Sequence, residues 1–462
     1  MRLTLARLLS AALWAAAAFA DDKAAADTAL DRYIRKPDPT YSYSVAGEAS
    51  CNGCTATVID LKSQTWRKPT EVDRTVWEHW LTIIRPPKVT SSKALLFING
   101  GSNGRPRPDR ADPMLQTFAK ETGAIVADLR MIPNEPLKFP GEDFTRTEDG
   151  IIAYTWDKAL RGGDEEWPLR LPMTKAVVRA MDTVTTFAKS EQGGGHAVDR
   201  FIVSGGSKRG WTTWTTAAVD KRVIAIAPLV IDMLNVEKSF QHHWRVYGFW
   251  APAVGDYQKL HLMDWMGSPE NQALMRVVEP WAYRDRIAVP KYIVNASGDQ
   301  FFVPDSSQFY FDQLPGEKLL RYVPNADHSL RNSDAPTSLL AWLDSIVHDR
   351  PRPKYSWAID GGRIRVKAET KPTEVRLWQA NNPEKRDFRL ETIGPAYTST
   401  VLQPDDSGDY SAALPKPEKG WTAYFVELTY SDGRKVPLKV TTGVRVMPDE
   451  YPFPPPKLVP PR

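Results

Sequence analysis

The segment 204–211, Ser-Gly-Gly-Ser-Lys-Arg-Gly-Trp, contains a serine that could act as a nucleophile. Apolar residues precede it and a helix-compatible run follows, over residues 208–219. A strand, a tight glycine turn with serine at its tip and a helix make a nucleophile elbow, which presents the hydroxyl beside a helix N-terminus. We therefore expect Ser207 to be the nucleophile. Arg209 stands where Gly is common and Gly210 comes one place late, so the alternative is a turn whose serine only caps the helix.

A serine hydroxyl is a weak nucleophile and needs a base to take its proton and an acid to orient that base. In α/β-hydrolases these residues follow in the order Ser, Asp or Glu, His. The chain supplies that order with Ser207, Asp299 and His328. Each comes directly after a short strand-like run, so all three are expected at one edge of a sheet. The competitors Asp327, Asp305 and His348 are less well placed: next to the histidine, farther from a strand end and at the end of a helix.

Two backbone N–H groups should stabilise the negative oxygen of the tetrahedral intermediate. We expect one from Lys208, which follows the nucleophile. The other is expected from Gly101, in the loop Asn-Gly-Gly-Ser-Asn at 99–103 that follows the apolar run 94–98. The loop is similar to the His-Gly-Gly-Gly loop of esterases, with Asn in place of His.

Two cations adjoin the expected nucleophile, Lys208 and Arg209. They could bind an anionic group of the substrate, and Arg209 is a candidate substrate-binding residue on that ground. The alternative is that both cations pair with nearby carboxylates and support the turn.

An aromatic-rich segment, residues 232–287, interrupts the alternation of strands and helices. A helical insertion at this place usually caps the ends of the strands, where ligands bind. Four side chains in it are candidates for lining a substrate pocket: His242, His243, Trp244 and Trp250. The alternative is a helical hairpin that simply packs, with core histidines.

Short buried strands alternating with helices predict an α/β fold over residues 21–350: a mostly parallel sheet of α/β-hydrolase type with helices on both faces and the cap insertion. After a Pro-rich linker the pattern becomes all-β. Short strands separated by turn signals over 354–446 predict an immunoglobulin-like β-sandwich. Residues 447–462 are Pro-rich and are expected to form a poorly ordered tail.

Residues 1–20 have the features of a secretory signal: two arginines, a short apolar run and an Ala-x-Ala site at 18–20. The chain is therefore expected to be exported, either periplasmic or secreted. The apolar run is short for a membrane span, and no later stretch reaches about 18 apolar residues, so stable membrane insertion is not expected. With 462 residues the chain can form two domains, and a net charge of +4 does not favour nucleic acid as a partner.

The sequence contains two cysteines, Cys51 and Cys54. In an exported chain a local disulfide is favoured. Zinc would require about two further ligands that the neighbouring residues do not supply. A redox role is the other alternative, but such motifs usually open a helix, and a strand-like run follows here. No metal or organic cofactor is expected.

The Ser-Lys-Arg-Gly-Trp motif, with Asn-Gly-Gly-Ser-Asn, Ser-Gly-Asp-Gln-Phe-Phe and Asn-Ala-Asp-His at 325–328, resembles the PhoPQ-activated pathogenicity-related proteins, which include autocrine proliferation repressors. The resemblance runs from about residue 30 to 446 and implies an α/β-hydrolase fold, export and a link to virulence or secreted signalling. A looser likeness, confined to the elbow, is to glucuronoyl esterases.

The sequence as a whole predicts an exported serine hydrolase that forms an acyl-enzyme. We expect an ester of a small molecule, a carbohydrate or a peptide as substrate, with an anionic or uronate ester as one option. The alternatives are a serine peptidase, and a non-catalytic signalling protein on a hydrolase scaffold. The oligomeric state stays open.

Overall fold

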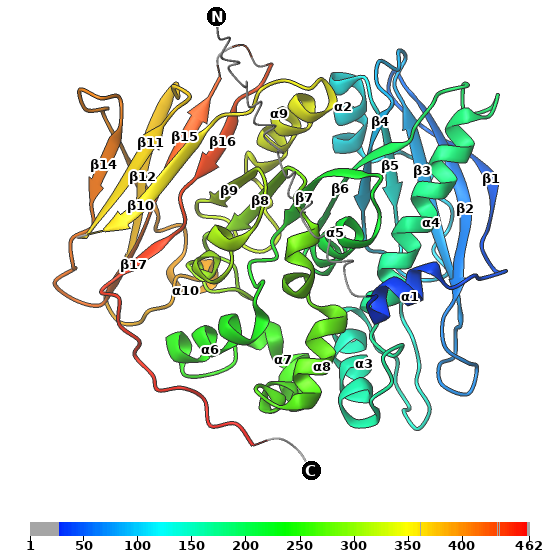
Figure 1. The fold of residues 1–462 in the computed structure, drawn as a ribbon, viewed down its shortest axis with the longest axis horizontal. Coiled ribbons are helices and arrows are strands. Elements are labelled where there is room, and N and C mark those ends of the chain that lie inside the picture. The colour runs from blue at the N-terminus through cyan, green and yellow to red at the C-terminus, as the bar shows by residue number, and fades with distance from the viewer. Residues whose placement is uncertain (1–26, 361, 432, 434, 460–462) are drawn as a thin grey trace, which may run out of the picture.

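The computed structural model describes residues 27–459 except 361, 432 and 434 (Figure 1). The predicted signal at 1–20 lies outside the described residues. The largest element is a nine-stranded sheet in the order β1-β2-β3-β5-β4-β6-β7-β8-β9. Its strands are β1 (Ser42–Ala49), β2 (Thr55–Thr65), β3 (Val76–Arg85), β4 (Lys93–Ile98), β5 (Ile125–Leu129), β6 (Arg200–Gly206), β7 (Val223–Leu229), β8 (Lys291–Ala296) and β9 (Lys318–Val323).

The strands β4 to β9 pair in parallel, and β1, β2 and β3 add an antiparallel edge. Every residue of β4, β5 and β8 is buried, which explains why these strands are mostly apolar on both faces rather than alternating between apolar and polar residues. The exchange of β4 and β5 in the sheet, with β6 at its centre, is the α/β-hydrolase arrangement. The predicted mostly parallel sheet is confirmed, and the chain has a hydrolase scaffold.

Helices cover both faces of the sheet, as the alternating pattern predicts. One core holds the buried faces of α4 and α5, and the other holds those of α2 and α9. None of the helices within residues 27–459 is both long and apolar enough to cross a membrane. The helices of the sheet region are α1 (Ala29–Arg35), α2 (Pro113–Thr122), α3 (Glu148–Gly162), α4 (Arg170–Lys189), α5 (Lys208–Val219) and α9 (Ala335–Val347).

The insertion between β7 and β8 is helical. It gathers with α3 at the lower edge of the view in Figure 1, below the sheet. Contacts of α3 with α7 and with α8 join the two parts. Its helices are α6 (Val236–Tyr247), α7 (Gly255–Lys259) and α8 (Pro269–Val278), with short 3₁₀ turns between and after them.

Two antiparallel sheets follow, in the orders β10-β11-β14 and β13-β12-β15-β16, with β17 also paired to β15. The first, second and fifth strands thus share one sheet and the third, sixth and seventh share the other, which is the immunoglobulin-like arrangement. The predicted sandwich is confirmed. Its elements are β10 (Tyr355–Asp360), β11 (Arg363–Ala368), β12 (Glu374–Asn382), α10 (Leu390–Ile393), β13 (Thr398–Val401), β14 (Tyr410–Ala413), β15 (Trp421–Tyr430), β16 (Leu438–Thr441) and β17 (Arg445–Met447).

The sandwich packs against the loops that follow β8 and β9. The backbone N–H of Leu390 donates to the carbonyl O of Gly298 at 2.9 Å, and a Cβ at Gly298 would lie 2.9 Å from Leu390. The amide of Asn325 donates to the carbonyl O of Tyr397 at 2.9 Å. These contacts support the two loops that carry Asp299 and His328.

Part of the tail expected at 447–462 contacts the cap. The ring of Tyr451 lies 3.8 Å below the guanidinium of Arg245 in α6, and the N–H of Phe453 donates to the carbonyl O of Arg245. The ring of Phe453 fills the space beside Gly248, where a Cβ would come within 2.6 Å of it. Aromatic residues among the prolines therefore fix this segment to the cap.

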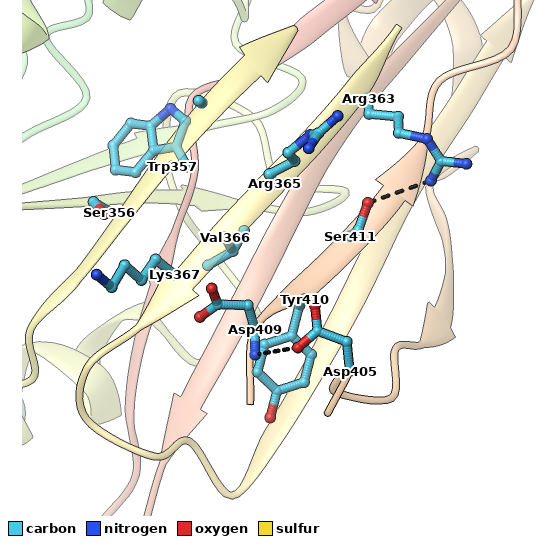
Figure 2. Close-up of a pocket in the computed structure, with 11 residues that line it drawn as sticks. Ser356, Trp357, Arg363, Arg365, Val366, Lys367, Asp405, Asp409, Tyr410 and Ser411 are labelled. Atoms are coloured by element: carbon cyan, nitrogen blue, oxygen red, sulfur yellow. Dashed lines mark hydrogen bonds between the residues drawn. The ribbon is translucent and has the colours of Figure 1, made fainter. Parts of the chain in front are cut away.

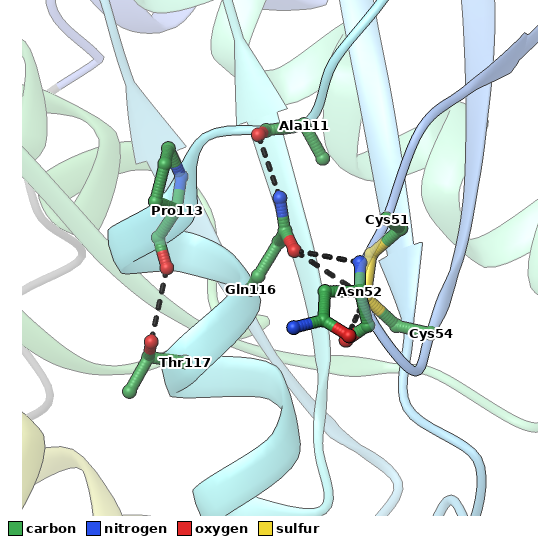
Figure 3. Close-up of a disulfide and its surroundings, with 7 residues drawn as sticks. All are labelled: Cys51, Asn52, Cys54, Ala111, Pro113, Gln116 and Thr117. Atoms are coloured by element: carbon green, nitrogen blue, oxygen red, sulfur yellow. Dashed lines mark hydrogen bonds between the residues drawn. A yellow bond between two sulfur atoms is a disulfide. The ribbon is translucent and has the colours of Figure 1, made fainter.

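Cys51 and Cys54 form a disulfide at the turn between β1 and β2, with their Cα atoms 5.3 Å apart (Figure 3). The side chain of Gln116 in α2 accepts a hydrogen bond from the N–H of Asn52, within the disulfide loop. It donates another to the carbonyl O of Ala111. The disulfide thus holds the β1–β2 turn in a shape that docks on α2.

Candidate active site

Ser207 stands on a sharp turn between β6 and α5. Its backbone has φ 58° and ψ −125°, a sparsely populated conformation for a residue with a side chain. Its N–H donates to the carbonyl O of Leu229 in β7 at 2.8 Å. Strained backbone of this kind persists where the surrounding structure enforces it, and it is concentrated at functional sites. The turn has the conformation of a nucleophile elbow.

The shifted glycine pattern of this elbow has a steric reason. A Cβ at Gly210 would lie 2.9 Å from the carbonyl O of Leu229 and 3.0 Å from that of Gly205. Gly205 in turn faces Arg209, with only 2.9 Å between their Cβ positions. Positions 205 and 210 therefore both have no room for a side chain, whereas position 209 does. Arg209 fits because its side chain leaves the turn beside Gly100.

A histidine and an aspartate meet beyond the ends of β8 and β9. Nδ1 of His328 and Oδ2 of Asp299 lie 2.8 Å apart. A carboxylate accepts only from a protonated nitrogen, so Nδ1 carries the proton and Nε2 has a free lone pair. Nε2 is buried and has no hydrogen-bond partner among the described residues. The imidazole is therefore oriented and able to accept a proton.

The segment that begins at Asp299 encloses this histidine. The side-chain oxygen of Gln300 accepts a hydrogen bond from the N–H of His328 at 3.1 Å. The rings of Phe301 and Phe302 lie 4.3 and 5.8 Å from the imidazole. The Ser-Gly-Asp-Gln-Phe-Phe segment thus supplies the acid, a backbone tether and an apolar wall.

Ser207 and His328 line the same cavity, which has a volume of about 340 Å³. Asn99, Gly100 and Arg209 also line it. The structure therefore brings the three residues of the expected triad to one place: Asp299 by its hydrogen bond, and the other two by a shared cavity.

The loop that follows β4 also reaches this cavity, through Gly100. Gly101, the expected second oxyanion donor, is not among the lining residues. It has φ 134°, and a Cβ there would lie 3.5 Å from the side chain of Met131. The structure thus favours Gly100 over Gly101 at the cavity. The N–H of Lys208 stands at the first position of α5, where it has no acceptor within the helix.

The two cations of the elbow are ion-paired. Nζ of Lys208 lies 2.5 Å from Glu148 and 3.2 Å from Asp149. Arg209 donates to both carboxylate oxygens of Glu148, at 2.9 and 2.7 Å, and to the carbonyl O of Ile132. Recognition of an anionic substrate by Arg209 is therefore not supported, because its charge is already neutralised. The alternative interpretation, pairing that supports the turn, describes the structure.

Glu148 and Glu135 form a coupled acidic pair beside the elbow. Burial favours the neutral form of Glu148, but Arg209 and Lys208 outweigh it and lower its pKa to about 2. Burial and the charge of Glu148 raise the pKa of Glu135 to about 7. Oε2 of Glu135 accepts the N–H of Glu148 at 2.6 Å, which fixes the start of α3.

Glu135→Gln is expected to stabilise the protein at pH 8 and to have little effect at pH 4. A carboxyl whose pKa is raised in the folded state costs stability once the pH exceeds its unfolded value near 4.5. That cost grows until the pH passes about 7, and glutamine removes it while keeping the acceptor for Glu148. The expected gain is up to about 2 kcal/mol in the free energy of unfolding. Urea unfolding of both proteins at the two pH values measures it, and an equal gain at both pH values would contradict the shift.

The predicted pocket histidines are core residues instead. Nε2 of His242 lies 2.7 Å from Oδ1 of Asp305, and its Nδ1 lies 2.9 Å from the hydroxyl of Tyr451. Oδ2 of Asp305 accepts from Arg386 of the sandwich at 2.7 Å. His243 accepts the N–H of Ala251, and burial lowers its pKa to about 3. Both side chains are buried, and neither lines a cavity at Ser207.

Trp244 and Trp250 also pack rather than face the nucleophile. Their ring centroids lie 5.1 Å apart, and Trp250 also contacts Phe240. Neither tryptophan lines a cavity at Ser207. The aromatic residue of α6 that does so is Phe240.

Two other aspartates near the site are engaged elsewhere. Asp305 is bound by His242 and Arg386. Asp232, just beyond β7, accepts hydrogen bonds from the hydroxyls of Tyr310 and Tyr322, both at 2.6 Å. Burial raises the pKa of Asp232 to about 8, so it is mostly uncharged at neutral pH and cannot stabilise an imidazolium. Asp299 is the carboxylate that contacts His328.

A larger cavity, of about 540 Å³, lies on the outer face of the β10-β11-β14 sheet (Figure 2). Arg365 and Lys367 of β11 line it together with Asp405 and Asp409. Its lining contains serines but no histidine, so the nucleophile–base pair belongs to the cavity at Ser207. Within the described ranges no cluster of His, Cys, Asp and Glu could hold a metal ion.

Sequence reasoning missed α3 and the two acids at its start. Thr147, Glu148 and Asp149 precede the apolar spacing Ile151, Ile152, Trp156, which is a helix start signal. The nearby prolines at 133, 136 and 140 obscured it.

The resemblance drawn from the motifs is confirmed. The model of the family described as PhoPQ-activated pathogenicity-related protein matches residues 30–389. Autocrine proliferation repressor protein A of Dictyostelium discoideum is 36% identical over 463 residues, covering 92% of each chain.

Solved structures similar to this chain are hydrolases of low sequence identity. Acetyl xylan esterase 1 of Thermoanaerobacterium sp. JW/SL YS485 is 14% identical, with a TM-score of 0.47 over 69% of this chain and 92% of that one. Acylaminoacyl peptidase of Pyrococcus horikoshii is 11% identical, with a TM-score of 0.41 over 69% of this chain and 51% of that one. Similarity at this level says nothing about the substrate.

Proposed function

The chain belongs to the PhoPQ-activated pathogenicity-related protein family, and we propose that this member is an exported serine hydrolase that acts on carboxylic esters. The observation that carries the proposal is the meeting of three features. Ser207 is held on a strained elbow, it shares a cavity with His328, and the imidazole is bound by Asp299 with Nε2 left free. Export rests on the signal-like residues 1–20 and fits a disulfide-bonded chain.

In this mechanism Oγ of Ser207 attacks the ester carbonyl while Nε2 of His328 takes its proton. Asp299 keeps the proton on Nδ1 and stabilises the imidazolium. The N–H of Lys208 and the loop that carries Gly100 stabilise the oxyanion. The imidazolium then gives its proton to the leaving alcohol, and water releases the acid from the acyl-enzyme by the same steps.

An ester is favoured over a peptide with a free amino group. Such a substrate needs carboxylates with unused charge near the nucleophile to bind its ammonium group. Glu148 and Asp149 reach the elbow, but Lys208 and Arg209 already pair with them. A free ammonium group would have to displace a buried lysine.

Labelling by a fluorophosphonate tests the proposal. The folded protein is expected to be labelled, and Ser207→Ala and His328→Ala are expected to lose the label, since the first lacks the nucleophile and the second its base. Ser204→Ala is a matched control, because Ser204 lies in the same strand with its hydroxyl bonded to the carbonyl O of Ala227. No labelling of the folded wild type would reject the proposal.

A second candidate is a non-catalytic signalling protein on the same scaffold. It is favoured by one finding, that the 36% identical relative is named for repression of proliferation. Folded protein that is never labelled, and that has the same biological effect with and without Ser207→Ala, would support this candidate.

A further inference from the structure

Ser207 lies between two cavities of very different size. One is the cavity of about 340 Å³ that it shares with His328. The other is a small cavity of about 30 Å³ on the side of the cap, lined by residues of α3, α5 and α6. A carbonyl carbon attacked by Ser207 carries two substituents, the acyl chain and the leaving group. Each cavity can take one of them.

The position of the base decides which substituent goes where. The leaving oxygen must receive a proton from Nε2 of His328 and must come within hydrogen-bond reach of it. His328 lines the large cavity and not the small one. The alcohol part of an ester therefore lies in the large cavity, and the acyl chain points into the small one.

The small cavity suits an uncharged apolar group. Six aromatic rings line it: Trp156, Trp211, Phe240, Tyr257, Phe301 and Phe302. Its charged side chains already have partners, although Nε of Arg170 and Nε1 of Trp156 have no hydrogen-bond partner among the described residues. Asp149 binds Lys208 and the hydroxyl of Tyr257, and Arg170 donates to the carbonyl O of Lys208. The acyl chain would therefore contact ring carbons.

The size of the small cavity limits the length of that chain. One water-sized group needs about 10–15 Å³ of such space, so about 30 Å³ accommodates two. We propose that the protein is a short-chain acylesterase that removes acetyl or propionyl groups from larger alcohols. This inference rests on the proposed serine hydrolase function and adds the substrate class.

Oγ of Ser207 adds to the acyl carbon, and the carbonyl electron pair moves onto oxygen to give the tetrahedral oxyanion. When the carbonyl re-forms, the bond from that carbon to the alcohol oxygen breaks. The proton passes from Oγ through His328 to the alcohol, and water later replaces Ser207 to release acetate or propionate.

The first test is a series of p-nitrophenyl esters with acetyl, propionyl, butyryl and octanoyl chains. Because each methylene that does not fit an apolar pocket costs roughly 10-fold or more, we expect kcat/KM for octanoate to be at least about 100-fold below that for acetate. Equal values for the two esters would overturn the inference.

The second test enlarges the cavity. Phe240 lines both the small cavity and a neighbouring one of about 20 Å³ within the cap, so Phe240→Ala should join them. We expect the octanoate-to-acetate ratio of kcat/KM to rise at least about tenfold. Phe249→Ala is the control, since this exposed cap residue lines neither cavity, and its ratio should not change. Phe240→Leu replaces the alanine variant if that variant does not fold.

Fluorophosphonate labelling distinguishes a failure of the proposed short acyl-chain preference from a failure of the proposed serine hydrolase activity. A fluorophosphonate label on Ser207 together with a flat ester series would reject the short acyl chain and leave the serine hydrolase standing. An unlabelled wild type would reject both.

Discussion

His328→Ala is expected to lower kcat for p-nitrophenyl acetate by roughly 10⁶-fold, because nucleophile and base act as a unit and removal of either abolishes activation of the hydroxyl. The structure shows one base in position, with Nδ1 bound to Asp299 at 2.8 Å and Nε2 without a partner. The variant should remain folded, but its thermal midpoint should fall by a few degrees, because Asp299 is 3% exposed and loses its hydrogen-bond partner. Stopped assays on freshly folded protein and a thermal scan make both measurements.

The matched control is a second buried His–Asp pair in the same molecule. His242 and Asp305 lie 2.7 Å apart, as close as the pair at the active site, but Tyr451 occupies the other nitrogen of this histidine. His242→Gln should keep kcat within about threefold and lower stability instead. A loss of kcat of less than tenfold in His328→Ala, or a larger loss in His242→Gln, would show that the base has been assigned wrongly.

Asp305→Asn is expected to lower the free energy of unfolding by about 3–5 kcal/mol while leaving kcat within about threefold. Asp305 and Arg386 are 3% and 2% exposed, so the loss of the carboxylate leaves a buried guanidinium without a counter-charge. The same carboxylate joins the cap, the sandwich and the C-terminal segment through His242 and Tyr451. Urea unfolding followed by tryptophan fluorescence gives the free energy, and an ester assay of the folded variant gives kcat.

The loss of unfolding free energy caused by Asp305→Asn should become smaller at low pH. Burial opposes ionisation of Asp305, but the charges of Arg386 and His242 hold its pKa well below the usual range. A carboxyl of this kind contributes fully above its unfolded pKa of about 4 and less as the pH falls further. The difference between wild type and variant should therefore shrink below pH 4.

Glu374→Gln provides the control for burial. Glu374 also binds an arginine, Arg376, through two contacts at 2.7 and 2.8 Å, but these side chains are 41% and 34% exposed. Its loss should cost less than about 1 kcal/mol. If Asp305→Asn lowers the free energy of unfolding by no more than this, the buried contacts of Asp305 with His242 and Arg386 do not stabilise the docking of the cap.

The sequence by itself determined the order of the elements and the residues that follow each strand. The run 94–98 is apolar at every position, and the run 319–323 is apolar except for Arg321, because parallel strands are covered on both faces. Such runs can be recognised locally. The carboxyl ends of parallel strands share one edge of the sheet, which is why Ser207, Asp299 and His328 could be selected together. The local disulfide and the strands of the sandwich could likewise be predicted from the spacing of nearby residues.

Only the tertiary structure decided which partner each charged or aromatic side chain takes. Lys208 and Arg209 meet Glu148 from a helix about 60 residues earlier, and His242 meets Tyr451 more than 200 residues later. Phe240 and His242 lie on the same helix, α6, yet Phe240 lines a cavity at Ser207 and His242 does not. Which of the two side chains reaches the cavity depends on how α6 packs against the rest of the fold. Ion pairs, pocket walls and pKa shifts arise from distances across the fold, and the residue types of one segment do not specify those distances.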